Sequence, residues 1–452
     1  MTTAEATELM LRYLEGEAGE GDVIRLQAAL SSSPELVAVC AEISRQHLQL
    51  RELAEESAVA APAPGLRVIA GGLSRPRFLR PAWVIAAAAA VIALAAILFR
   101  SLENAPRATV AAIVITSQDA TPPPPGASWQ SGTRLLLHTL NLRTGSVRLR
   151  LENGALITLT APVTAEFLSP LLVRVRHGQI TADVSGGGKG LIVQAHDTEV
   201  MDLGTEFGVN VSDNGRADVV VFDGEVQLQK AAASGAKPWM NLNGGEAVRL
   251  DAARHATRIQ AVYGEAGTNA WSLEASSDAE TLVQSVSDNI TLPDFQGYYR
   301  VMPRGMKPGA APYGGKTPLW EAPEGKPFPA VLLDADVIST FQGKRFNPEF
   351  ALTLALNHPA TVFVMHDIRQ PPPVWLQRDY SRTEAALSLP LRPGLLSAEV
   401  AATVPTDAQG RLFLTFSVWR RDVPAGTVIL GESHASSERI PHFMYGLAVR
   451  AR

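Results

Sequence analysis

Two stretches near the C-terminal end combine side chains that bind sugars in other proteins. HDIRQPPPVWL contains Asp367, Arg369 and Trp375, and SVWRRDVPAGTV contains Trp419. An indole ring can stack on the apolar face of a sugar, while Asp and Arg can bond to its hydroxyl groups. These residues therefore suggest a carbohydrate or wall-polymer site. The pattern is also typical of Asp–Arg pairs that fix loops and of tryptophans that pack. The sequence favours this second interpretation without excluding the first.

Histidine and aspartate side chains also occur close together in the middle of the chain, without catalytic spacing. They are His177, Asp183, His196, Asp197 and Asp202. No Ser/His/Asp set, paired Glu or His-x-x-x-His spacing selects any of them for catalysis. The single cysteine, Cys40, rules out an internal disulfide and a thiolate metal cluster. We therefore expect no enzyme activity, no metal site and no cofactor.

The bulk composition is that of a folded protein of several domains. The chain has 452 residues, of which 46% are hydrophobic and 19% charged, with a net charge of −5. This length predicts about two to four domains. Since no global basic field is present, we expect no direct binding to nucleic acid.

One long apolar run predicts a membrane span. Residues 82–99, AWVIAAAAAVIALAAILF, contain no charged side chain. As a helix they would extend about 27 Å, close to the roughly 30 Å hydrocarbon core of a bilayer. A buried core helix is the alternative.

The residues before this run set its expected orientation. The preceding linker, residues 58–81, carries four arginines and no acid. By the positive-inside rule, the N-terminus lies in the cytoplasm. The sequence thus predicts a single-pass protein of the inner membrane, with a periplasmic C-terminal part.

Residues 1–57 carry apolar side chains at helical spacing, which predicts a small all-α cytoplasmic head of three short helices. We expect a partner to contact the apolar positions Leu9, Tyr13, Leu14, Leu26 and Leu30. A unit this small has a modest core, so a partner would complete it. A self-contained anchor without a partner is the alternative.

The rest of the chain is predicted to be all-β. Residues 100–130 include the run TPPPPG and are expected to form an extended linker. Residues 131–255 contain short alternating strands, with expected hairpin turns at Asn153-Gly154, His177-Gly178, Asp223-Gly224 and Gly244-Gly245. Residues 286–452 contain further strands between loops rich in Pro and Gly, which favours a β-sandwich.

The series of strand motifs in residues 131–255 resembles the FecR domain. It comprises the Asn153-Gly154 turn, the hairpin Val173–Val184, the stretch LGTEFGV, the hairpin Val219–Val226 and a final strand from Gly245 to Leu250. The fold-specifying positions implied by this resemblance are Gly154, Gly178, Leu203, Gly204, Thr205, Phe207 and Gly224. We interpret Gly204 as a bulge or close strand crossing, with Thr205 bonding a backbone group that the irregularity frees.

The stretch LMLRYLEGEAGEGDVIRLQAALSSSPELVAV resembles the cytoplasmic N-terminal segment of FecR-type anti-sigma regulators. It lacks the His-x-x-x-Cys-x-x-Cys motif, so the resemblance is to the zinc-free kind. It implies that the head binds an extracytoplasmic-function sigma factor and that the outer β domains sense an envelope protein or glycan. The C-terminal part departs from iron-transport FecR proteins, which puts a siderophore-receptor partner in doubt.

Two other functions stay open from the sequence. One is a membrane-anchored envelope protein that binds carbohydrate or wall polymer without a regulatory role. The other is an envelope enzyme that acts on polysaccharide through carboxylates of the last domain.

Overall fold

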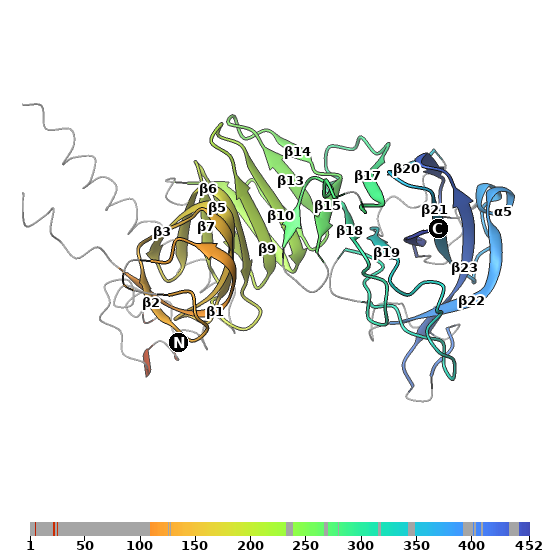
Figure 1. The fold of residues 1–452 in the computed structure, drawn as a ribbon, viewed down its shortest axis with the longest axis horizontal. Coiled ribbons are helices and arrows are strands. Elements are labelled where there is room, and N and C mark those ends of the chain that lie inside the picture. Colours follow the sequence, from red (N-terminus) through yellow and green to blue (C-terminus); the bar gives the residue numbers. More distant parts are fainter. Residues whose placement is uncertain are drawn as a thin grey trace, which may run out of the picture.

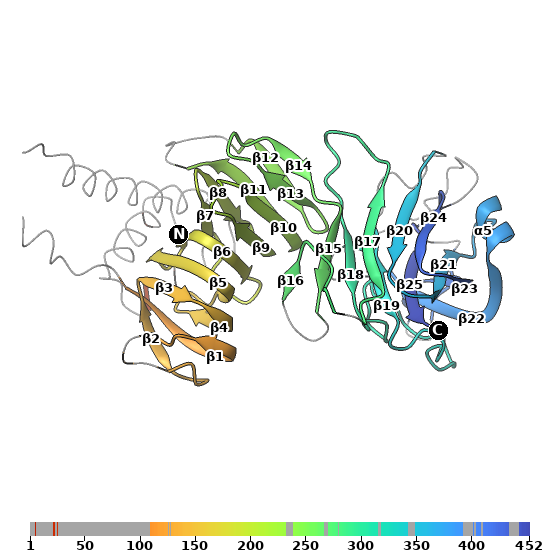
Figure 2. The same cartoon turned by 45° about the horizontal axis from the view of Figure 1, so that its top comes forward.

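The protein is represented by a computed structural model. The structure describes residues 5, 21, 22, 25 and 109–452, except 125, 127, 232–237, 266–269, 279, 315–317, 342–348, 392–400, 402–403, 408–409 and 434–442. Two β units lie side by side along the long axis of the molecule (Figures 1 and 2).

The first unit is one fourteen-stranded sheet within the described residues. Its strands are β1 (Val110–Thr121), β2 (Arg134–Leu137), β3 (Thr139–Leu142), β4 (Thr144–Leu151), β5 (Leu156–Ser169), β6 (Leu172–Asp183), β7 (Ile192–Ala195), β8 (Thr198–Asp202), β9 (Glu206–Val211), β10 (Ala217–Asp223), β11 (Glu225–Lys230), β12 (Met240–Asn243), β13 (Ala247–Leu250) and β14 (Ala256–Arg258). It begins at β1, within the segment expected to be a linker.

Strand β6 divides this sheet into two layers. Its first half pairs in parallel with β7, and its second half pairs antiparallel with β9. One layer continues through β8, β11 and β12, and the other through β10, β13 and β14. Val193 and Val200 of the first layer share one core with Phe207 and Val219 of the second. Apolar residues alternate along each strand, so each layer has one apolar face. The two layers pack these faces against each other.

The chain passes between the two layers at three successive glycine corners. They lie between β8 and β9 at Gly204, between β10 and β11 at Gly224, and between β12 and β13 at Gly244 and Gly245. The corners are stacked, because the Gly244 amide donates to the Gly224 carbonyl at 2.8 Å. A Cβ on Gly224 would lie 2.9 Å from the Gly204 carbonyl oxygen.

The expected hairpin turns differ from the observed ones. Asn153-Gly154 does join two paired strands, β4 and β5. His177-Gly178 does not turn the chain but lies inside β6, where a Cβ on Gly178 would overlap the Pro162 carbonyl oxygen. Asp223-Gly224 is a corner, since β10 and β11 pair with different strands. A Gly at positive φ marks an irregularity in the backbone but does not determine which strands pair across it.

The second unit contains an eight-stranded and a three-stranded sheet within the described residues. The larger sheet contains β15 (Ala261–Gly264), β16 (Trp271–Ser272), β18 (Tyr299–Met302), β19 (Asp336–Ser339), β21 (Ala360–Asp367), β22 (Ser381–Pro390), β23 (Phe413–Val423) and β25 (Gly446–Ala451). The smaller sheet contains β17 (Val283–Asp288), β20 (Leu352–Leu356) and β24 (Gly426–Leu430), and the short helix α5 spans Val374–Asp379. Leu354 of β20 and Val364 of β21 belong to one hydrophobic core that the two sheets share.

The described residues correct the predicted fold class. The sequence suggested an all-α head and a membrane helix before two all-β domains, whereas the described residues are nearly all β-strand. None of their helices has the length and apolar character that crossing a membrane requires. Apart from residues 5, 21, 22 and 25, the predicted head (1–57) and the predicted span (82–99) lie outside the described residues. Strands dominate from Val110 onward because apolar residues there recur with period two rather than 3.6.

Candidate functional site

An apolar seam joins the two units. The residues that pack in it are Val220, Phe222, Ala247, Ile259, Val262, Trp271 and Tyr298. In β10, Val219 and Val221 point into the core of the first unit, so Val220 and Phe222 point the opposite way, into the seam. The apolar run VVVF is therefore a strand buried on both faces.

Trp271 is the largest side chain of this seam and contacts the second layer of the first unit. A Cβ on Gly208 would lie 2.6 Å from the Trp271 ring, so the absence of a side chain at Gly208 makes room for the indole. The indole Nε1 donates to Thr181 Oγ1 at 2.9 Å, and Gln179 Nε2 donates to the Trp271 carbonyl at 2.9 Å. Trp271 thus fixes β16 of one unit onto β6 and β9 of the other.

Backbone pairing continues across the same seam. The Ala247 amide donates to the Gln296 carbonyl at 2.9 Å, and the Tyr298 amide donates to the Gly245 carbonyl at 3.0 Å. The Tyr298 hydroxyl donates to the Val221 carbonyl at 3.2 Å. The seam is therefore held by directional bonds as well as by apolar contact.

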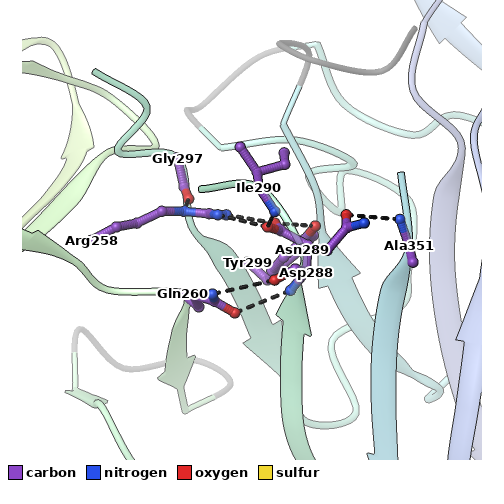
Figure 3. A network of polar contacts seen from close by, with 8 residues as sticks. All are labelled: Arg258, Gln260, Asp288, Asn289, Ile290, Gly297, Tyr299 and Ala351. Atoms are coloured by element: carbon purple, nitrogen blue, oxygen red, sulfur yellow. Dashed lines mark hydrogen bonds and ion pairs between the residues drawn. The ribbon is translucent and has the colours of Figure 1, made fainter. Parts of the chain in front are cut away.

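A buried carboxylate, Asp288, connects all three sheets at this junction (Figure 3). Arg258, from β14, donates to Asp288 Oδ1 and Oδ2 at 2.7 Å each. The Tyr299 hydroxyl, from β18, donates to Oδ2 at 2.8 Å, and the Ile290 amide donates to Oδ1 at 2.8 Å. Asp288 itself ends β17 of the three-stranded sheet. We call this set of four residues the Asp288 node.

The surroundings of the node exclude water. The side chains of Arg258 and Asp288 are 10% and 0% exposed. The Arg258 guanidinium lies 4.5 Å from the Phe295 ring centre and 5.5 Å from that of Phe341. Burial, reinforced by the Asp288 charge, raises the pKa of Tyr299 well above its usual value, so its hydroxyl remains a donor.

Beside the junction lies an open cleft of about 1610 Å³. Its walls include Tyr263 and Trp271 from β15 and β16, together with residues near the C-terminal end of the chain. Four of its carboxylates form no ion pair with other described residues: Glu274, Asp278, Glu280 and Asp334. A fifth, Asp336, accepts from the Arg304 amide at 2.9 Å, and burial raises its pKa. The cleft thus combines these carboxylates with basic side chains such as Arg304 and with apolar ones such as Trp271 and Leu282.

The corner at Gly204 is organised by a carboxylate that the sequence did not single out for this role. Asp202 Oδ1 accepts from the Gly204 amide at 2.9 Å, from the Thr205 amide at 2.7 Å and from the Thr205 hydroxyl. Its Oδ2 accepts from the Gly190 amide at 3.4 Å. Burial raises the pKa of Asp202 to about 6, although these donors act in the opposite direction. Thr205 therefore bonds to a side chain, and not to a freed backbone group.

Of the other positions that the resemblance marks, Gly154, Leu203 and Gly224 lie in turns and corners, whereas Gly178 and Phe207 lie within β6 and β9. Gly154 has φ +91° in the β4–β5 turn, and Gly224 has φ +83° at its corner. The Leu203 amide donates to the Glu225 carbonyl at 3.2 Å, and Phe207 is fully buried in the core of the first unit. These residues shape the fold, and no ligand-binding geometry is evident among them.

The structure shows each of the proposed sugar-binding side chains engaged by neighbouring groups. Asp367 and Arg369 form a local ion pair, with Arg369 Nη2 donating to Oδ2 at 2.5 Å. The Trp375 ring packs against Tyr380, and its Nε1 donates to the Glu432 carbonyl at 3.0 Å.

The second tryptophan is engaged elsewhere on the sheet. Trp419 Nε1 donates to Ser417 Oγ at 3.0 Å, and in the β21–β23 register Trp419 lies opposite Val364. Asp367 lies opposite Phe416 in the same register. The four side chains therefore do not form one stacking platform.

The junction residues were not identified from the sequence. Four of them, Arg258, Trp271, Asp288 and Tyr298, lie within residues 256–302, a region with strands of two to six residues. Strands this short show little periodicity. The available signal was an isolated tryptophan between small and polar residues, and this pattern does not identify a partner.

Two other predictions have a limited outcome. The expected sigma-binding residues Leu9, Tyr13, Leu14, Leu26 and Leu30 lie outside the described residues. Within the described part of the chain, no group of three or more His, Cys, Asp or Glu side chains is arranged to hold a metal ion.

Comparison with solved structures gives distant similarities. Two structures of a candidate anti-sigma factor from Parabacteroides distasonis are 22% and 23% identical to this chain, each with a TM-score of 0.23. Each match covers 27% of this chain and 58% or 59% of the other. A β-glucuronidase of glycoside hydrolase family 2 is 13% identical, with a TM-score of 0.27, over 78% of this chain and 40% of that one. The matches thus span less than two thirds of each of these proteins, and scores this low support no functional argument.

Comparison with protein families is more specific. No curated protein matches the sequence. The family model described as FecR protein matches residues 138–227. This range begins just before β3 and ends within β11, so it contains the split strand β6 and the corners at Gly204 and Gly224. Residues 138–227 are therefore similar to the FecR family, and this matched part lies inside the first β unit.

Proposed function

We propose that this protein regulates a sigma factor of the extracytoplasmic-function class. The observation that carries the proposal is the FecR match at residues 138–227, in which Gly204 and Gly224 occupy corners between the two layers. The sigma factor would bind Leu9, Tyr13, Leu14, Leu26 and Leu30, the apolar positions identified in the sequence.

The proposal places the two β units outside the cytoplasmic membrane, where they receive a signal from an envelope protein or glycan. Support for this location comes from the sequence, because four arginines and no acid precede the apolar run 82–99. Support for ligand reception comes from the open cleft beside the junction of the units, which mixes charged and apolar side chains. An open cleft that carries both charged and apolar groups is a common form of ligand site.

The proposed role is regulatory, without a catalytic step. In the C-terminal unit, the Asp367 carboxylate is engaged by Arg369, and Trp375 is engaged by its neighbours. These side chains are therefore accounted for by packing and ion pairing. The proposed contribution of this unit is binding.

A transcription reporter tests the proposal. Each extracytoplasmic-function sigma factor of the source organism would drive its own promoter fused to a reporter, with and without the full chain. We expect the chain to change the output of one sigma factor severalfold. The matched variant is Leu14→Asp with Leu26→Asp, which should abolish the change. If no sigma factor responds to the full chain, the regulatory function is wrong.

A further inference from the structure

The Asp288 node differs from an ordinary surface ion pair in its position. Its three side-chain members, Arg258, Asp288 and Tyr299, come from three different sheets. Exposed ion pairs contribute little, but a buried charge that loses its partner is strongly unfavourable. A large part of the free energy needed to separate the units should therefore come from leaving the Asp288 carboxylate without its partner.

The network extends into both units from this carboxylate. Gln260, between β14 and β15, accepts from the Asp288 amide at 3.1 Å and donates to the Asp288 carbonyl at 3.4 Å. On the other side, Asn289 accepts from the Ala351 amide at 3.0 Å (Figure 3). Asn289 also donates to the Glu349 carbonyl at 2.7 Å. Gln260, in the segment that links the two units, is thus bonded to Asp288, and the residue after Asp288 is bonded within the second unit.

We propose that the Asp288 node locks the two β units into one body. While Arg258 neutralises Asp288, the junction can exclude water and the units keep a single relative orientation. Without Arg258, the Asp288 charge must reach water. Since the Asp288 side chain is fully buried, water reaches its carboxylate only when the junction opens.

The lock would serve the proposed regulatory function, because a rigid junction passes a displacement of the C-terminal unit directly to the stacked corners of the first unit. This consequence rests on the proposed function. The lock itself does not, so its test is a distance measurement that requires no sigma factor.

Pulsed electron spin resonance on the full chain tests the lock. Cys40 would be replaced by serine, and spin labels would be attached to Asn241→Cys in β12 and Thr427→Cys in β24, both exposed strand positions. We expect a narrow distance distribution in the parent and a broad one in Arg258→Met. If the distance distribution is equally broad in the parent and in Arg258→Met, or narrow in both, the lock is overturned.

A matched control is present in the first unit. Arg249 donates to the buried Asp218 at 2.6 Å, but both residues belong to the same sheet. Arg249 lines a cavity beside the junction, but Arg249→Met removes a pair within one sheet and leaves the bonds of the node in place, so the distribution should stay narrow. Broadening by Arg249→Met equal to that by Arg258→Met would mean that the node has no special role.

A charge-rescue variant separates the lock from simple packing. Adding Asp288→Asn to Arg258→Met removes the unpaired charge, so the distribution should narrow again. Persistent broadness in the double variant would contradict the proposal. If Arg258→Met does not fold, Tyr299→Phe carries the test, because it removes one donor to Asp288 at little volume cost. Detectable broadening is then expected, and an unchanged distribution would overturn the lock.

Discussion

Two glycine corners differ in what limits substitution, although both have a positive φ. Gly204 has φ +111°, and a Cβ there would contact only the Lys189 side chain, at 3.4 Å from Cε. Gly224 has φ +83°, and its Cβ would lie 2.5 Å from Thr205 Cγ2 and 2.9 Å from the Gly204 carbonyl oxygen. Substitution at Gly204 is thus limited by its backbone conformation alone. Substitution at Gly224 is limited both by its conformation and by a collision of the new Cβ with the backbone.

We therefore predict that Gly224→Ala destabilises the first unit more than Gly204→Ala. The backbone penalty at Gly204 should be about 1–2 kcal/mol. Urea unfolding followed by circular dichroism would measure both variants. Equal losses would show that the stacked corner relaxes without cost. Gly309→Ala is a suitable reference, since it shares a positive φ but has open space for a Cβ.

Asp202 provides a prediction about pH. Its folded-state pKa of about 6 is above the ordinary 3.8, so between these values the folded protein binds more protons than the unfolded chain. Stability from this group is therefore highest at low pH and is lost as pH rises through about 4 to 6. The size of the loss is on the order of 3 kcal/mol.

Asp202→Asn should remove this slope, because the amide does not titrate and can still accept a bond from the Gly204 or Thr205 amide. The measurement is the free energy of unfolding of both proteins between pH 4 and 7. Parallel curves for parent and variant would contradict the assignment. Other buried carboxylates contribute equally to both proteins and cancel in the difference.

At the scale of elements, the sequence indicated strands and irregularities better than it indicated pairing. Asn153-Gly154 forms the expected hairpin because its two strands are adjacent in sequence and in the sheet. Gly178 and Gly224 carry the same local pattern, yet one lies within β6 and the other joins two layers. Pairing depends on contacts distant in sequence, and a turn motif carries no information about them. For the same reason, the sequence did not reveal the Asp288 node.

The contact of β16 with β9 allows a double-mutant cycle. Trp271 packs where Gly208 has no side chain, so Gly208→Ala should collide with the ring and destabilise the parent protein. Trp271→Ala should cost about 3–5 kcal/mol by leaving a cavity. In that background, Gly208→Ala should cost little, since the ring is absent. Thermal unfolding of the parent, the two single variants and the double variant gives the coupling free energy between Trp271 and Gly208. If the two losses of stability simply add, the two residues do not interact as described.

At the scale of the whole molecule, the seam and the node predict cooperative unfolding. The apolar cluster around Trp271 and Tyr298 contains residues of both units, and the node joins their three sheets. We therefore expect a single calorimetric transition for the two units in the parent protein. In Arg258→Met this transition should separate into two. In Arg249→Met its midpoint temperature should fall, but it should remain a single transition. Two separate transitions in the parent would mean that the units fold independently.

The central claim is that this protein regulates a sigma factor, and binding tests it most directly. The full chain would be affinity-purified after co-expression with each extracytoplasmic-function sigma factor in turn, beside the Leu14→Asp, Leu26→Asp variant. The account predicts stoichiometric recovery of one sigma factor with the parent chain and its loss with the variant. Recovery of none of them, under conditions in which the chain is folded and abundant, would contradict it.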